Sequence, residues 1–140
     1  MAYITLSCPV PTTTTSTTTS TTTPSPLGNI EFDWAMGSSL VLNATAANVN
    51  SVPLTYIGGD DFPFNSGGPH VFSTTETGTN QTVTITLDTT YAGQSITITD
   101  SNLVSQCANI NTGTNDVVFT NVAIDNITSV RVIPSEGTCP

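Results

Sequence analysis

Positive charge is almost absent from this sequence. Its 140 residues include a single basic residue, Arg131, and no lysine, against 10 acidic residues, so the formal net charge is −9. Nucleic-acid binding requires clustered lysine or arginine side chains to contact phosphates, and attraction to anionic lipid requires the same. No apolar run approaches the roughly 18 residues that a transmembrane helix needs. We therefore expect neither nucleic acid nor a membrane as a partner.

Residues that favour helices are also scarce. Charged residues make up 8% of the chain, whereas an average protein has about 25%. Thr, Ser, Asn and Gly supply the polar surface instead. Because β-branched threonine suits a pleated strand, this composition predicts an all-β protein.

The N-terminal residues lack the features of a secretory signal peptide. Residues 1–10 (MAYITLSCPV) have no basic region, no long apolar region and no small-residue cleavage site. The threonine-rich composition is nevertheless typical of extracellular proteins. Two interpretations stay open: a protein that leaves the cell in or on a particle such as a virion, or a mature form whose signal has been removed.

The first 26 residues read as an arm in two parts. The assembly or anchor segment is Tyr3, Ile4, Thr5, Leu6 and Ser7, which alternates like a strand but is too short to be stable alone. Residues 9–26 are rich in Thr, Ser and Pro and bury too little to offset their ordering entropy. At about 3.1 Å per residue this tether spans on the order of 50 Å. A disordered tail and a glycosylated stalk are the alternatives.

The rest of the chain has strand character at regular spacing. In the clearest run, residues 82–87 (TVTITL), Val83, Ile85 and Leu87 fall on one face and threonines on the other. Residues 103–110 are compatible with a short helical turn. We predict an anchor peptide over residues 1–8, a tether over 9–26 and one antiparallel β-sandwich, jelly-roll or Ig-like, over 27–140. The predicted strands are residues 30–34, 39–43, 52–57, 70–74, 81–87, 94–99, 116–122 and 127–133.

Strand edges have little protection in this sequence. Proteins usually block unwanted pairing with lysine, proline or inward-pointing charges on their edge strands. Lysine is missing altogether here. We expect the edges to be covered by neighbouring subunits, in a homo-oligomer or a larger assembly.

The cysteines are odd in number: Cys8, Cys107 and Cys139. The simplest expectation is three unpaired thiols. An odd count also allows one bridge, within the chain or between subunits, and a Cys8–Cys139 link would join the two termini. No CxxC or Cys/His spacing is present, so a zinc site is not expected.

Few residues point to catalysis. His70 is the single histidine, and no GxSxG motif places a serine near it, so we predict a structural role and no enzymatic activity. Phe32 and Trp34 share one face of a strand and read as core.

The loop around residue 60 is the one candidate ligand site. Asp60 and Asp61, with Asn65, have oxygen ligands for calcium, but the DxDxDG spacing is missing and a solvated loop is the expected state. Phe62 and Phe64 are expected to belong to the core; if they are exposed, stacking on a sugar is the alternative. We expect no cofactor and no metal.

The run from Thr12 to Thr23, flanked by Pro11 and Pro24, resembles the threonine tracts of structural proteins of tailed phages. The resemblance is compositional and covers about one fifth of the chain. It implies a short N-terminal segment that docks on the particle and a β-rich domain that projects outward.

Three functions follow from these observations. The first is a non-enzymatic virion structural protein on the virion surface: a capsid decoration protein, head fibre or tail-associated component. The second is an extracellular filament subunit joined by a donor strand and by disulfides from Cys8 to Cys107 or Cys139 of a neighbour. The third is a secreted carbohydrate-binding or adhesion module. All three functions consist of binding other macromolecules, and in the first two the partners are protein subunits.

Overall fold

The chain folds as a β-sandwich in a computed structural model that describes residues 26–34, 42–89, 93–111, 113 and 115–140. Within these ranges it has strands and no helix, which confirms the predicted fold class. The strands are β1 (Gly28–Trp34), β2 (Asn43–Val49), β3 (Val52–Pro53), β4 (Thr55–Gly58), β5 (Gly67–Thr74), β6 (Gly78–Thr89), β7 (Gln94–Thr99), β8 (Ser105–Ile110), β9 (Asp116–Ile124) and β10 (Val130–Ser135).

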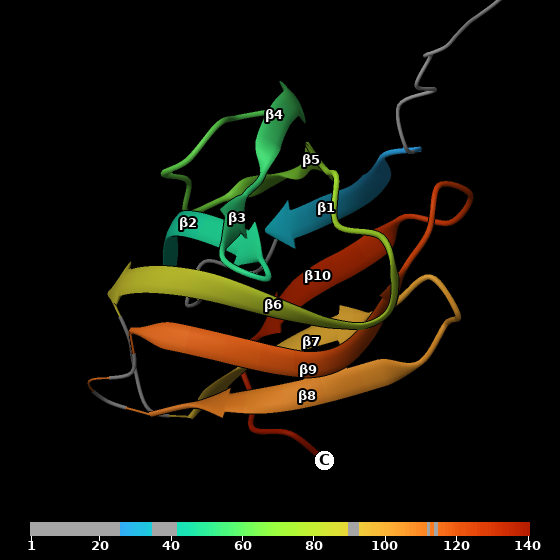
Figure 1. The fold of residues 1–140 in the computed structure, drawn as a ribbon. Coiled ribbons are helices and arrows are strands. Elements are labelled where there is room, and N and C mark those ends of the chain that lie inside the picture. The colour runs from blue at the N-terminus through green and yellow to red at the C-terminus, as the bar shows by residue number, and fades with distance from the viewer. Residues whose placement is uncertain (1–25, 35–41, 90–92, 112, 114) are drawn as a thin grey trace, which may run out of the picture.

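Two sheets of unequal width form the layers. A 6-stranded sheet has the order β4-β5-β1-β10-β7-β8, and a 4-stranded sheet has the order β3-β2-β6-β9 (Figure 1). Paired strands are antiparallel except β1 and β10, which run parallel. On one side of the sandwich β8 lies beside β9, where Gln106 Nε2 donates to Thr120 O at 2.7 Å.

Alternation along the strands builds the core. Val83, Ile85 and Leu87 of β6 are buried as predicted, and so are Ile96 and Ile98 of β7. Each buried side chain of this size contributes about 1.5–3 kcal/mol relative to an exposed one. The threonines between them are half-buried on the other face, where Thr86 Oγ1 donates to Asp116 Oδ1 at 2.9 Å. The core is therefore shared by both sheets.

Aromatic side chains fill one end of the core. Phe32 and Trp34 of β1 are buried, as the sequence predicts, with their ring centroids 5.8 Å apart. The Trp34 indole Nε1 donates to the Leu42 carbonyl at 2.9 Å, so the polar end of the indole is satisfied. Phe72 of β5 meets Phe32 edge-on at 5.6 Å.

The strand predicted over residues 52–57 is divided. Asn50 and Ser51 have positive φ angles, as a two-residue hairpin turn requires, and return the chain from β2 into β3. The chain then leaves the 4-stranded sheet at Leu54 and continues as β4 at the edge of the 6-stranded sheet. One apolar run thus serves both sheets.

Two other predictions differ from the structure. Residues 103–110 do not form a helical turn, because Gln106, Ala108 and Ile110 face inward at strand spacing and pair with β7. The last strand begins at Val130 rather than at Ile127, because the Asp125 carboxylate holds a turn there. The strand predicted over residues 39–43 falls largely outside the described residues, and β2 begins at Asn43.

Candidate docking site

The predicted anchor segment lies outside the described residues. Tyr3, Ile4, Thr5, Leu6 and Ser7, together with Cys8 and the tether, precede Pro26, where the description of the chain starts. The anchor therefore stays a prediction. What the structure adds is the surface from which the arm departs and the surfaces that could receive it.

The phenylalanines of the predicted ligand loop belong to the core. Phe64 is 5% exposed, and Phe62 is half-buried and packs against the core cluster. The Phe62 ring stacks on Phe72 at 4.5 Å and on Phe64 at 5.1 Å. These ring faces already contact aromatic partners, so Phe64 and most of Phe62 belong to the core, as the sequence favours, and the alternative of a sugar-stacking platform is not supported.

His70 ties the same loop together. It is 2% exposed, and its Nδ1 accepts the Asp60 backbone N–H at 2.9 Å. Because that amide can only donate, the ring proton sits on Nε2, which donates to Ser66 O at 2.7 Å. Both ring nitrogens are therefore used, and the ring lies 4.2 Å from that of Phe64. This is the structural role that the sequence predicts.

The two acidic residues of the loop lie at the surface. Asp61 Oδ1 accepts the N–H of Phe62 at 2.8 Å, and both Asp60 and Asp61 are exposed. Among the described residues, no group of three or more His, Cys, Asp or Glu side chains is placed to hold a metal ion.

Two cysteines form a disulfide that the sequence did not single out. Cys107 of β8 is bonded to Cys139 in the C-terminal tail, with their Cα atoms 5.8 Å apart. The expectation of three unpaired thiols is thus wrong for this pair, and Cys139 is not linked to Cys8 of its own chain. Alternation on β8 turns Cys107 outward, to the surface that the tail crosses.

Hydrogen bonds fix the tail beside this disulfide. Cys139 N donates to Asn109 Oδ1 at 2.7 Å, and Ser95 Oγ donates to Gly137 O at 2.6 Å. Ser95 is 2% exposed although its neighbours on this face of β7, Thr97 and Thr99, are half-buried. The tail therefore covers the ends of β7 and β8.

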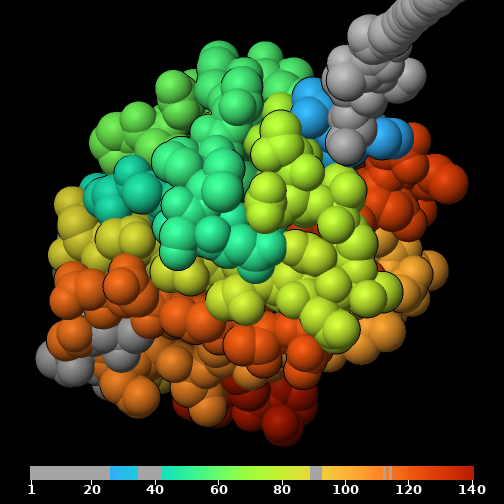
Figure 2. Space-filling view, viewed as in Figure 1, coloured from blue at the N-terminus to red at the C-terminus, as the bar shows by residue number. Residues whose placement is uncertain are grey.

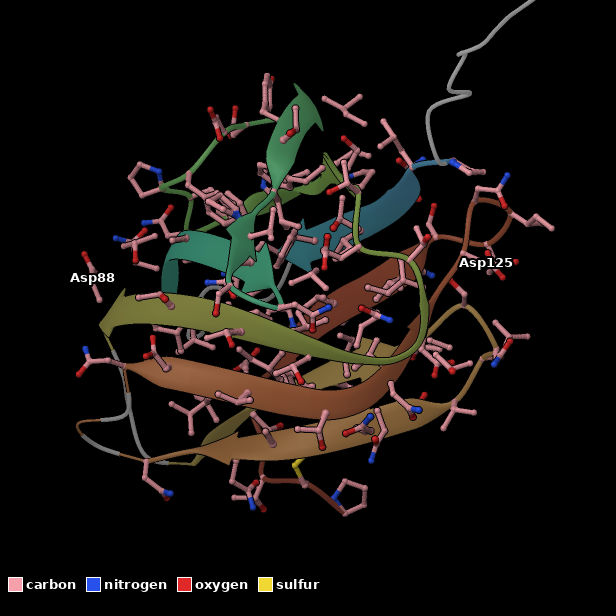
Figure 3. The ribbon with its side chains drawn as sticks, viewed as in Figure 1. Asp88 and Asp125 are labelled. Carbon is pink, nitrogen blue, oxygen red and sulfur yellow. A yellow bond between two sulfur atoms is a disulfide. The ribbon has the colours of Figure 1, made fainter. Side chains whose placement is uncertain are left out.

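Apolar loop tips stand at the end of the sandwich where β1 begins. Leu103 is 74% exposed and Ile127 is 86% exposed. Ser101 joins their two loops: its Oγ donates to Thr128 O at 2.6 Å and accepts the Asp125 N–H at 2.9 Å. Asp125 lies in the β9–β10 loop (Figure 3). This pair of tips was not expected from the sequence, because Leu103 belongs to no motif and Ile127 was predicted to start a strand.

The edges of the two sheets differ in how they are protected. Each sheet has two terminal strands, which gives β3 and β9 in one sheet and β4 and β8 in the other. β3 has only two residues and ends in Pro53, which cannot donate to another strand. β8 and β9 lie against each other. Within the described chain, β4 is the edge that neither proline nor a second edge strand covers.

β4 is also apolar. Its sequence, Thr-Tyr-Ile-Gly, contains no charge. Tyr56 is 44% exposed and Ile57 is 54% exposed, and Val52 on the adjoining β3 is 39% exposed. In Figure 2 the green segment that includes β4 forms the outer margin of the molecule. We take the outer edge of β4, defined by Thr55, Tyr56, Ile57 and Gly58, as the candidate docking site and call it the β4 edge.

Comparison with known proteins identifies no relative. No family model, no curated protein and no solved structure matches the chain. Over the described residues, the structure has no helix with the length and apolar character to cross a membrane.

Proposed function

We propose that this protein is a non-enzymatic structural protein of a virion, on the virion surface, which docks on other protein subunits through its N-terminal arm. One observation carries the proposal: a sandwich with its own filled core is joined, at the start of β1, to 25 residues whose strand-like anchor cannot bury its apolar side chains alone. A segment of that kind gains structure from a partner's sheet.

The surface composition supports the same reading. An edge without lysine is prone to pair with another chain, unless assembly covers it. A virion provides many copies of the same surface at fixed spacing. A capsid decoration protein, a head fibre and a tail-associated component all fit this description.

The test uses virions purified from a culture in which the gene is expressed. We expect mass spectrometry to find the chain in fixed stoichiometry with the major capsid protein after density-gradient purification. Salt washing should leave it bound. Its absence from purified virions, with the chain present in the remaining lysate, would end the proposal.

The disulfide favours a second candidate, an extracellular filament subunit. Disulfides persist in oxidising compartments, and Cys107 and Cys139 form one within the chain. A filament with disulfide links would then use Cys8 alone, since the other two cysteines are bonded to each other. Because one free thiol can link only two chains, non-reducing gels of material from the producing culture should show a band of twice the monomer mass that Cys8→Ser removes, and any longer filament would depend on the donor strand. A single band for the wild-type chain would count against disulfide-linked filaments.

A further inference from the structure

We propose that the β4 edge receives residues 3–7 of a second copy of this chain, as an added strand of the 6-stranded sheet. The inference rests on the proposed function, because it names the surface on which the arm docks. It commits to exchange between copies, and self-insertion and a free arm are outcomes of the test.

The position of β4 at the end of its sheet creates the acceptor. β4 is the terminal strand of the 6-stranded sheet, paired on one side with β5 only. Tyr56 lies on the inner face of β4, because it pairs with Phe72 across β4 and β5 and meets the Phe72 ring at 5.9 Å. The margin continues with half-buried Leu54 and Phe62. A strand added outside β4 would cover this apolar margin.

The anchor segment has the pattern that this margin needs. Ile4 and Leu6 fall on one face of an extended residue 3–7 segment, and Tyr3, Thr5 and Ser7 fall on the other. Paired with β4, Ile4 and Leu6 would lie over Tyr56 and extend the core. Neither strand carries a charge, so pairing them leaves no buried charge uncompensated.

The lengths of the two strands also agree. β4 has 4 residues, and a β-bulge between Tyr56 and Gly58 leaves Ile57 without a partner residue on β5. A short, bulged edge does not support long strands. It suits a donor of about five residues, such as residues 3–7.

The tether is long enough to reach the β4 edge of a neighbouring copy as well as that of its own molecule. Asn29 of β1, Ser73 of β5 and Thr55 of β4 lie in one row across the sheet. Strands are spaced about 4.8 Å apart, so the start of β1 is about 10 Å from the β4 edge. The tether over residues 9–26 spans on the order of 50 Å extended, and about 25 Å as a flexible coil. On a surface that carries many copies, a neighbouring β4 edge lies within this reach, and the experiment below separates exchange between copies from self-insertion.

Two variants and their mixture test the inference by sedimentation velocity of the full chain. Leu6→Asp disables the donor, and Ile57→Lys places on the edge the charge that edge strands commonly use against pairing. We expect the wild-type chain to form species above the monomer mass, and each variant alone to lose them. The mixture should form a one-to-one complex of twice the monomer mass, because one intact arm and one intact edge remain.

A matched control addresses non-specific effects of lysine. Val118→Lys changes an apolar residue with 53% exposure on β9, close to the 54% of Ile57, and should leave assembly unchanged. Recovery in the mixture also shows that both variants are folded. A wild-type chain that is monomeric at its highest soluble concentration, variants that assemble like wild type, or a mixture that stays monomeric would each overturn the inference.

The two proposals fail separately. If the chain is absent from virions but the variants complement each other, arm exchange stands and the virion assignment falls. If the chain is a stoichiometric virion component but no exchange is measured, the reverse holds.

Discussion

Gly68 stands where β5 approaches the end of β1, with a φ of +129°. A Cβ atom at this position would lie 2.8 Å from Phe32 O and 3.1 Å from Trp34 N. Both neighbours are backbone atoms of a strand in the middle of the sheet, so neither can move without disturbing the pairing of β1. The β1–β5 register shifts between Phe32 and Trp34, next to this contact.

Gly68→Ala should therefore lower the free energy of unfolding by about 2 kcal/mol or more, from the strained φ and the close contact together. Urea denaturation measures the change. Gly137→Ala is the control, because a Cβ at Gly137 meets nothing within 4 Å, and we expect its effect to stay within about 0.5 kcal/mol. Equal stability of the two variants would contradict the geometry at Gly68.

Asp125 makes the free energy of unfolding depend on pH. The Thr128 and Ile127 backbone amides donate to its carboxylate, and they hold the Asp125 pKa below its ordinary value of 3.8 in the folded state. Because the folded pKa is the lower one, this contribution to stability is fully present above the unfolded value and is lost as the pH falls through the folded value.

Asp125→Asn should thus destabilise the protein at neutral pH, and the difference from wild type should shrink as the pH falls below 3.8 and through the lowered pKa of the folded state. Thermal unfolding at several pH values measures the difference. An Asn variant whose deficit is the same at both pH extremes would show that the charge at Asp125 does not contribute.

Among the structural elements, the C-terminal tail depends on a covalent link rather than on strand pairing. The Cys107–Cys139 disulfide closes a loop with a sequence separation of 32 residues. The chain-entropy relation assigns such a loop about 3–4 kcal/mol of stabilisation, acting through the unfolded state.

Replacing both bonded cysteines by serine should lower the free energy of unfolding by up to about 3–4 kcal/mol. Cys8→Ser, which leaves the disulfide intact, should leave the free energy of unfolding unchanged. Guanidinium denaturation of the two proteins, without reductant, makes the comparison. A loss in Cys8→Ser equal to that of the double variant would mean that the stabilising bond involves Cys8.

Elements with strict alternation were predictable from the sequence, and those that depend on distant partners were not. Val83, Ile85 and Leu87 reveal β6 because they lie on the buried face of that strand, whereas the threonines between them lie on the less buried face. β8 was missed because its inward residues include polar Gln106 and small Ala108, which do not give an apolar alternation, so that pairing with β7 determines its conformation. The disulfide was missed for the same reason, since it needs β8 to place Cys107 under the tail.

The candidate site was predictable only in part. The sequence indicated an anchor segment and unprotected edges, but it did not identify which edge is exposed, because that depends on the order of strands in the two sheets. The sequence left sugar stacking open for Phe62 and Phe64 because they lie in a glycine-rich segment, whereas in the structure they pack against Phe32 and Phe72 in the core. Loop composition alone does not show which way a ring turns.

For the molecule as a whole, charge opposes association. Arg131 is the one cation of the sequence, and it lies 3.4 Å from Asp33 in an exposed ion pair. Exposed pairs contribute little stability. The net charge of −9 means that copies repel each other, while the uncharged β4 edge attracts.

Self-association should therefore strengthen when salt is raised from about 0.01 M to about 0.15 M, because the Debye length falls from about 30 Å to about 8 Å. Sedimentation velocity at the two salt concentrations measures this. Association that weakens with added salt would indicate that ion pairs, rather than an apolar edge, hold the copies together.

The most direct test of the account is hydrogen–deuterium exchange of the full chain at low and high protein concentration. We expect amides of residues 3–7 and of β4 to gain protection together as concentration rises, because each arm pairs with the edge of another copy. Protection of residues 3–7 that is independent of concentration would show that the arm folds onto its own molecule. Lack of protection at every concentration would show that it binds no copy at all, and either result would contradict the account.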